Sequence, residues 1–260
     1  MDRATVQGIY DTLFSTESKL KRQHSYPIHK RLNPDILQYA DIYEWISQEV
    51  NFTPKSNVLD AGCGVGYGSM LLASQHDIRV TGISLSDLEI VQARKVATSK
   101  NLDQRVKFQL QSFDDLAEKS FDVIIAVESV KHSFDLQHTL QVLVNALKPN
   151  GQLLIVEDFY LQKELTKTAK KYVKDWKLLD AFRFEDYFQV LSHDKCQLTD
   201  LTASMFLKNK RKIQFQLALS NIFQITQKAA LSRIFRGGFY LDQLYAERLM
   251  KYQVLQYYKH

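Results

Sequence analysis

The chain has 260 residues, 45% of them hydrophobic, and a formal net charge of +5. These values fit one globular domain with added segments, and they predict neither a membrane span nor a nucleic-acid partner, because no stretch is apolar for long enough and acidic residues are spread along the chain. The two cysteines, Cys63 and Cys196, give neither a disulfide framework nor a metal site, and with no signal-peptide pattern they predict a cytoplasmic protein.

The first 50 residues are predicted to be helical. Apolar residues recur at helical spacing in 10–14 and again in 36–46, as they do on one face of a helix. Between these stretches Pro27 favours an extended conformation for Tyr26 and breaks the pattern. We therefore treat residues 1–50 as a separate N-terminal helical segment.

Residues 57–68 combine a strand, a glycine-rich turn and a helix start. Apolar, β-favouring residues lead into glycines at alternate positions, and a helix-forming stretch begins at Ser69. This arrangement turns backbone N–H groups toward a ligand. A phosphate loop is excluded because no Gly-Lys-Ser/Thr follows. The G-x-G-x-x-G dinucleotide fingerprint is excluded because Tyr67 or Ser69 stands where its last glycine belongs.

What remains is the pattern Asp60-x-Gly62-x-Gly64-x-Gly66. It resembles the first motif of the class I S-adenosylmethionine-dependent methyltransferases, the alternative being a glycine-rich turn in another α/β protein. The resemblance implies S-adenosylmethionine as cofactor, with the loop passing under its methionine part. It also implies that Asp60 helps to hold the amino group of the cofactor.

From residue 56 onward, strand-like and helix-like stretches alternate. Further strands are predicted at 80–83, 106–110, 121–127 and 152–156, with helices at 86–100 and from 136 to 147. This alternation predicts a parallel, doubly wound sheet whose ligands bind beyond the carboxyl ends of the strands. The glycine loop follows the first strand, so it lies at that edge.

Beyond residue 158 the pattern becomes mainly helical. Helices are predicted at 163–182, 185–192 and 212–231, and strands at 197–202 and 252–258, the last at an edge of the sheet. By its resemblance to the family, the chain is expected to form a seven-stranded, mostly parallel α/β sheet of the Rossmann-like methyltransferase type with helical lids. The expected units are an N-terminal lid (1–50), a cofactor-binding core (51–205), a helical lid insertion (206–248) and the last core strand (249–260).

The resemblance places cofactor contacts at the ends of successive strands. After the second strand most family members have an acidic residue for the ribose, whereas this chain has Ser84 and Leu85. One branch, which includes cyclopropane synthases, uses a hydroxyl there and a glutamine five residues on, where this chain has Glu89. We predict that Ser84 and Glu89 bind the ribose, the alternative for Glu89 being an exposed helix position.

After the third strand, Ser112 and Phe113 stand where family members often use an aspartate for the adenine. Ser112 is predicted to hydrogen-bond the purine and Phe113 to pack on its face. Cys63 in the glycine loop, to which we assign no nucleophilic role, and Val127 at the end of the fourth strand complete the predicted cofactor contacts.

The fourth strand runs into Glu128-Ser129-Val130-Lys131-His132. Glu-Ser-x-x-His resembles small-molecule methyltransferases and not the Asn/Asp-Pro-Pro-Tyr motif of enzymes that methylate base amino groups. His132 is predicted to be a general base because an unperturbed imidazole pKa lies near neutrality, and the alternative is a packed loop histidine. Glu128 is predicted to orient the substrate or to stabilise positive charge.

Three residues are candidates for the substrate pocket. Resemblance to methyltransferases with an N-terminal lid implies Tyr26 and His29, with surface loop positions as the alternative. Lys131 is the third, and it replaces a glutamate of the cyclopropane synthases, which argues against lipid cyclopropanation. Aromatic residues of the second lid would suit an apolar substrate; they are Phe206, Phe215, Phe223, Phe235, Phe239 and Tyr240.

A row of lysines is predicted on one face of the helix after the fifth strand, at positions 163, 167, 170, 174 and 177. Such a row is usually a solvated face. The alternative is a docking surface for an acidic carrier protein or a phosphorylated substrate.

The resemblance implies methyl transfer to a small, hydrophobic metabolite such as a natural product or an isoprenoid-like acceptor, by in-line displacement. Positioning supplies much of the rate of such a reaction, and a base is needed only where the nucleophile must lose a proton. Two alternatives stay open. The protein could keep the cofactor for structure and catalyse a cyclisation, or it could be a non-enzymatic cofactor-binding partner.

Overall fold

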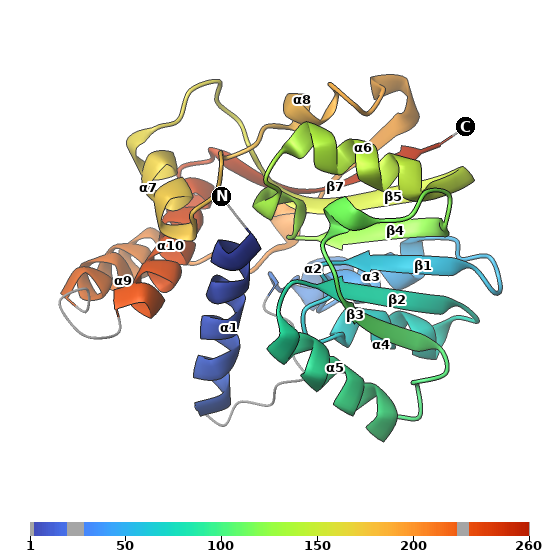
Figure 1. The fold of residues 1–260 in the computed structure, drawn as a ribbon. Helices are drawn as coiled ribbons and strands as arrows, with labels where there is room; N and C mark the ends of the chain where they lie inside the picture. Colours follow the sequence, from blue (N-terminus) through green and yellow to red (C-terminus); the bar gives the residue numbers. More distant parts are fainter. Residues whose placement is uncertain (1–2, 20–28, 223–228, 260) are drawn as a thin grey trace.

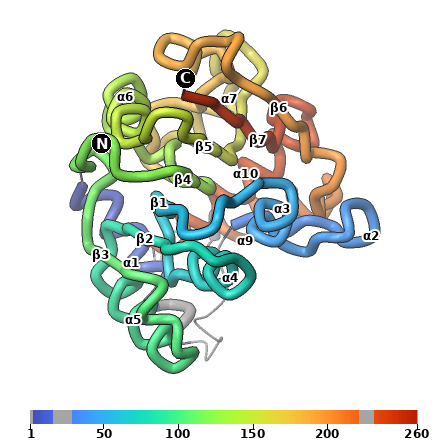
Figure 2. Tube along the Cα trace, turned by 90° about the vertical axis from the view of Figure 1, so that its right-hand side faces the viewer, coloured from blue at the N-terminus to red at the C-terminus, as the bar shows by residue number. Residues whose placement is uncertain are grey.

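The computed structural model of the protein describes residues 3–19, 29–222 and 229–259. Its centre is one sheet of seven strands in the order β3-β2-β1-β4-β5-β7-β6 (Figures 1 and 2). The strands are β1 (Asn57–Ala61), β2 (Arg79–Ser84), β3 (Val106–Leu110), β4 (Phe121–Val127), β5 (Leu147–Tyr160), β6 (Cys196–Asp200) and β7 (Met250–Tyr258). The first five are parallel, and β7 runs antiparallel to both β5 and β6.

The helices form two layers on the sheet and a third group beyond one end of it (Figure 1). They are α1 (Arg3–Lys19), α2 (Pro34–Leu37), α3 (Ile42–Glu49), α4 (Tyr67–Gln75), α5 (Asp87–Ser99), α6 (Leu136–Ala146), α7 (Lys167–Trp176), α8 (Phe184–Tyr187), α9 (Lys210–Ile222) and α10 (Ala229–Ala246). Short 3₁₀ turns lie at η1 (Phe113–Asp115), η2 (Val130–His132), η3 (His193–Lys195) and η4 (Thr202–Ser204). Within the described ranges, no helix combines the length and hydrophobicity that a bilayer-spanning segment requires.

Each face of the sheet has its own hydrophobic core, as expected for strands buried on both sides. One core packs α3, α4 and α5 against the sheet around residues such as Ile46, Met70 and Ala93. The other packs α6 and α8 around Leu140 and Tyr187. Figure 2 shows α6 on one face and α3 and α4 on the opposite one. The predicted doubly wound α/β sheet is therefore confirmed.

The third group of helices covers the carboxyl ends of the parallel strands. In Figure 1, α1, α7, α9 and α10 gather at the side of the sheet where these strands end. The two lid segments are far apart in sequence, yet Ile9 and Leu13 of α1 pack with Ile234 of α10 in a small separate core. This helical roof encloses space above the glycine loop.

Several predicted elements differ from the observed ones. The expected helix at 163–182 shrinks to α7, because Lys177 takes a left-handed conformation (φ 52°) that ends it. The helix expected at 185–192 is only the single turn of α8, and the stretch 36–46 divides at Gln38, which is also left-handed (φ 63°). The prediction that 252–258 forms an edge strand is wrong: β7 pairs on both sides and is buried almost throughout, and β6 is the edge.

Candidate active site

A cavity of about 390 Å³ lies beyond the ends of β1, β2 and β4 and beneath α1, α7 and α10. Its lining includes Gly62, Cys63 and Gly64 of the loop after β1, and Leu85 and Val127 from later strand ends. The strand ends that were predicted to meet at one site therefore do so. Asp60, Gly66 and Ser112 are near neighbours that do not line the cavity.

The glycines of the loop are required for two different reasons. Gly62 and Gly66 have positive φ values of 91° and 77°, and a side chain would meet Ser129 at 2.5 Å or Phe108 at 2.3 Å. Gly64 also has a positive φ, 52°, but a Cβ there would face open space, with Oε1 of Glu89 at 3.9 Å as its nearest neighbour. Gly62 and Gly66 thus fit the loop to the protein, whereas Gly64 leaves room for a ligand.

Asp60 lies beneath the loop and is fully buried. Its carboxylate accepts hydrogen bonds from the hydroxyl of Tyr43 at 2.8 Å and from Ser69 at 2.6 Å. Burial raises the pKa of Asp60, although both hydrogen bonds oppose the shift. The observed contacts tie the first strand to α3 and α4, and the predicted contact with a cofactor amino group stays a prediction.

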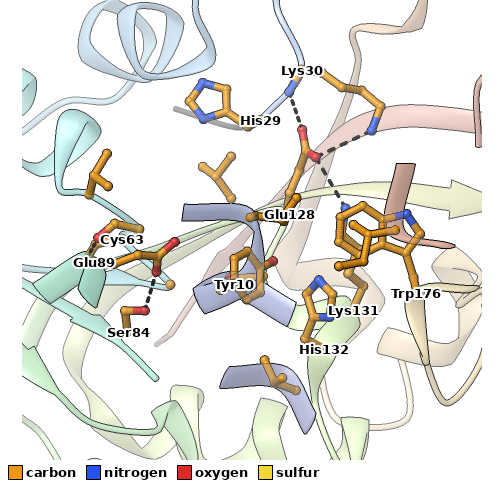
Figure 3. A pocket seen from close by; sticks show the side chains of 18 of the residues that line it. Tyr10, His29, Lys30, Cys63, Ser84, Glu89, Glu128, Lys131, His132 and Trp176 are labelled. Carbon is orange, nitrogen blue, oxygen red and sulfur yellow. Dashed lines mark hydrogen bonds and ion pairs between the residues drawn. The ribbon is translucent and has the colours of Figure 1, made fainter. Parts of the chain in front are cut away.

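Ser84 and Glu89 form a polar pair at the end of β2. The Ser84 hydroxyl donates to Oε2 of Glu89 at 2.7 Å, and Ser86 caps α5 by accepting from the backbone N–H of Glu89 at 3.3 Å. Glu89 is 3% exposed, so the alternative of an exposed helix glutamate is wrong. Both side chains line the cavity on the side of Cys63 (Figure 3).

At the end of β3, Phe113 lines the cavity and Ser112 does not. The Ser112 hydroxyl caps η1 by accepting from the backbone N–H of Asp114 at 3.2 Å, and it contacts the Asp114 carboxylate at 3.3 Å. Gln111 reaches the cavity from the preceding position. The predicted purine contact of Ser112 remains untested, while the observed role of its hydroxyl is local.

Glu128 accepts from a backbone N–H and two ammonium groups converge on it. It takes the left-handed conformation at φ 49°, which is uncommon for a residue other than glycine and marks a constrained position. Its Oε1 accepts from the backbone N–H of Lys30 at 2.8 Å, and its Oε2 lies 3.6 Å from Nζ of Lys30 and 3.4 Å from Nζ of Lys131 (Figure 3). Burial opposes ionisation, but the two lysines hold the pKa of Glu128 well below its usual range.

The same lysines also contact the end of β5. Asp158 lies 2.6 Å from Nζ of Lys30 and 3.1 Å from Nζ of Lys131, and it accepts from the hydroxyl of Tyr245. Glu157 accepts from the backbone N–H of Lys131 at 3.1 Å. Burial, with the neighbouring charge of Asp158, raises the pKa of Glu157 to about 7 against the opposing charge of Lys131.

His132 is buried at the far side of the cavity from Glu89 (Figure 3). Its ring meets Tyr10 edge-on with centroids 5.5 Å apart and lies 5.9 Å from the ring of Trp176. Burial and the nearby charge of Lys131 lower its pKa to about 3. This pKa lies far below the unperturbed value from which the prediction of a base was argued, so the imidazole is neutral at physiological pH, and the role of His132 as a base stays a prediction.

The remaining predicted substrate residues divide between the described and undescribed parts of the chain. His29 and Lys131 line the cavity, and Nε2 of His29 lies 2.7 Å from the carboxylate of Asp41. Tyr26 lies outside the described residues. Sequence reasoning missed Tyr10, Lys30, Tyr172 and Trp176, which also line the cavity; of these, Tyr172 and Trp176 carried a signal as members of an apolar stripe.

Some of the lid aromatics line the cavity, whereas the whole lysine row is exposed. Phe235 and Phe239 line the cavity, although Phe235 is 47% exposed. Phe206 and Phe215 are exposed away from the lining, Tyr240 is buried without lining the cavity, and Phe223 lies outside the described residues. The lysines at 163, 167, 170, 174 and 177 are all exposed. Exposure agrees with a solvated face and with a docking surface alike, so the carrier-protein prediction stays open.

Comparisons with known proteins match the core of the chain and, in the case of the family model, part of the second lid. The family model of the methyltransferase domain matches residues 52–235. The chain is 29% identical to norajmaline N-methyltransferase of Rauvolfia serpentina over 149 residues, which cover 56% of this chain and 49% of that protein. It is 36% identical to 27-O-demethylrifamycin SV methyltransferase of Amycolatopsis mediterranei (strain S699) over 106 residues, which cover 40% of this chain and 39% of that protein.

Among solved structures, the crystal structure of the 4+2 cyclase SpnF is similar to this chain with a TM-score of 0.77. The match covers 98% of this chain and 94% of that chain at 18% sequence identity, so it shows the fold alone. The matched segments span about half or less of the two curated relatives.

Replacing Glu89 by Ala should weaken binding of S-adenosylmethionine, the cofactor that the sequence motif implies, by roughly 10- to 100-fold, because the variant lacks the buried carboxylate that is predicted to accept hydrogen bonds from both ribose hydroxyls. Asp87→Ala is the matched control, since Asp87 is an exposed acid in the same first turn of α5. Isothermal calorimetry measures both. Equal affinities of the two variants would exclude Glu89 from the cofactor site.

Glu157 should make the protein less stable as pH rises. Its folded pKa of about 7 lies above the ordinary value of 4.5, so its contribution is complete below the unfolded pKa and is lost as pH rises through the folded one. Relative to Glu157→Gln, the wild type should lose about 2 kcal/mol of unfolding free energy between pH 5.5 and 8. Urea denaturation at both pH values checks this, and parallel pH dependences would contradict it.

Proposed function

The chain belongs to the S-adenosylmethionine-dependent methyltransferases, and from this premise we propose that it transfers a methyl group to a small, apolar acceptor held beside His132. The observation that carries the proposal is the division of the cavity. One end has the glycine loop and the Ser84–Glu89 pair, and the other has a neutral histidine among aromatic side chains. Two ligands of different polarity suit these two ends.

The cofactor would lie at the polar end. Gly64 and Glu89 line the cavity side by side, since a Cβ at Gly64 would lie 3.9 Å from Oε1 of Glu89, and without a side chain at Gly64 the loop leaves the cavity in front of it free for a nucleoside and its methionine chain. Ser84 and Glu89 would hold the ribose hydroxyls, and Phe113 would pack on the adenine. These residues fit S-adenosylmethionine by their chemistry and by their place around one cavity.

When bound, the cofactor would supply an electrophilic methyl group on a sulfonium, whose sulfur would keep the electron pair of the carbon–sulfur bond once the methyl group has been transferred. His132 would accept the proton of an acceptor hydroxyl at an unprotonated ring nitrogen. Its low pKa makes it a weak base that is nevertheless in its basic form at every physiological pH. Glu128, kept ionised by its lysines, would favour positive charge nearby.

A natural product is the acceptor class that we favour, because norajmaline N-methyltransferase and 27-O-demethylrifamycin SV methyltransferase both carry such compounds in their names. A cyclisation is the second candidate, since the 4+2 cyclase SpnF has the same fold along nearly its whole length. Placement in the cytoplasm and docking of an acidic carrier protein on the exposed lysine row remain proposals of the same kind.

Turnover with a matching acceptor should release one S-adenosylhomocysteine per product and raise the product mass by one methylene. Both are measured by liquid chromatography with mass spectrometry on a panel of hydroxylated aromatic and polyketide-type compounds. Product formation with an unchanged mass and no S-adenosylhomocysteine would instead support the cyclisation.

His132→Ala should lower turnover by about 100- to 10,000-fold and leave cofactor affinity within about twofold, because proton removal is lost while the glycine loop is unchanged. His138→Ala is the matched control, since His138 is exposed on α6. His132 should not titrate near pH 6.5, because its pKa is about 3. The pH profiles of the wild type and the variant should therefore have the same shape in that range. Normal turnover of His132→Ala would remove it from the mechanism.

A further inference from the structure

Two side chains on one wall of the cavity carry buried polar atoms that lack a partner. Both ring nitrogens of His132 and the indole nitrogen of Trp176 have no hydrogen-bond partner among the described residues. Both residues line the cavity, with ring centroids 5.9 Å apart (Figure 3). Buried polar groups in folded proteins are nearly always hydrogen-bonded. Three unpartnered atoms at one wall therefore mark the place of polar ligand atoms.

Trp176 is held in place by contacts between α7 and α10. The carboxylate of Asp175, the preceding residue, pairs with the guanidinium of Arg236 through two hydrogen bonds of 2.5 and 2.6 Å. Gly237 lies directly against the indole, because a Cβ at that position would be 2.4 Å from Cδ1 of Trp176. The indole N–H is thus fixed at the wall by packing and by a buried ion pair.

Gly238 provides space beside this wall. It lies in the middle of α10 and lines the cavity, and a Cβ there would meet nothing within 4 Å. Two successive glycines weaken a helix interior. Gly237 is explained by the indole, and Gly238 by the volume it leaves open to a ligand.

The side chains around this wall are mainly apolar, and the charges of Lys208 and Asp242, which also line the cavity, are paired with each other at 2.6 Å. Tyr10 and Leu13 of α1 face the same cavity as Ile234, Phe235 and Phe239 of α10. Such a lining suits a flat, apolar ligand, whose few polar atoms must meet the few polar atoms of the wall.

We propose that His132, Trp176 and Gly238 form an acceptor subsite that selects an apolar molecule carrying a hydroxyl and a neighbouring oxygen. This inference rests on the proposed methyl transfer and names its substrate class. A neutral imidazole accepts from the hydroxyl, and the indole, which has only a donor, donates to the second oxygen. The two ligand atoms must be close together because the two rings are. Trp176 is then a specificity-determining residue and His132 the group that touches the reacting hydroxyl.

Two probes of nearly equal shape test the subsite. 2-Methoxyphenol carries a hydroxyl beside an ether oxygen, and 2-ethylphenol replaces that oxygen by a methylene. Their dissociation constants are measured by ligand-observed NMR with protein saturated with S-adenosylhomocysteine. Trp176→Phe keeps the aromatic plane and loses the N–H. In this variant the dissociation constant of 2-methoxyphenol, relative to that of 2-ethylphenol, should rise about tenfold.

Gly238→Phe provides a second variant, which should abolish binding of both probes by filling the subsite. Gly8→Ala is its control, because Gly8 lies in α1 with open space around it and should leave both constants unchanged. Affinity for S-adenosylhomocysteine should be the same in all variants. An unchanged ratio in Trp176→Phe, or no binding of 2-methoxyphenol to the wild type, overturns the subsite. Failure of the wild type to bind S-adenosylhomocysteine instead overturns the proposed function on which the subsite rests.

Discussion

Lys131 pairs with Glu128, Glu157 and Asp158 near the ends of β4 and β5, Lys30 pairs with the first and last of these carboxylates, and the remaining site is arranged around that cluster. Buried charges are tolerated only where they are paired and hydrogen-bonded. With Glu157 protonated, two lysines face two carboxylates and the cluster is neutral, which is consistent with the raised pKa of Glu157. Because Lys30 precedes α2 and Tyr245 belongs to α10, the same cluster fastens both lid segments to the sheet.

Local sequence was sufficient to predict the core of the fold, because each parallel strand there is followed by its own helix or turn. The glycine loop and the helices predicted at 86–100 and from 136 to 147 follow from local signals, and the structure confirms them as the loop after β1, α5 and α6. The predicted edge position of β7 was wrong because local sequence does not determine it. Its alternation fits an edge as well as a centre, and only long-range pairing with β5 and β6 decides between them.

The residues of the site likewise fall into those that the sequence predicts and those that only tertiary packing brings to the cavity. Glu128 directly after β4 and Glu89 in the first turn of α5 were predicted from the sequence, because both match family positions that follow strand ends and topology brings those ends together. Lys30, Tyr10 and Trp176 were missed because α1, α7 and the segment before α2 reach the cavity only through tertiary packing. Asp158 was missed although a signal existed, since Glu157 and Asp158 are two adjacent acids directly after the apolar run 153–156 of β5.

His132 connects the two parts of the site. It follows a core strand, so sequence motifs locate it, but its neighbours Tyr10 and Trp176 come from α1 and α7 of the helical roof. Burial is the main cause of its lowered pKa, and these two side chains are among those that cover it. The helices of the roof therefore contribute to the protonation state of the histidine as well as to the shape of the space beside it. Two family members with the same strand-end motif and different lids would differ in the acceptor they bind and also in the strength of the base that meets it.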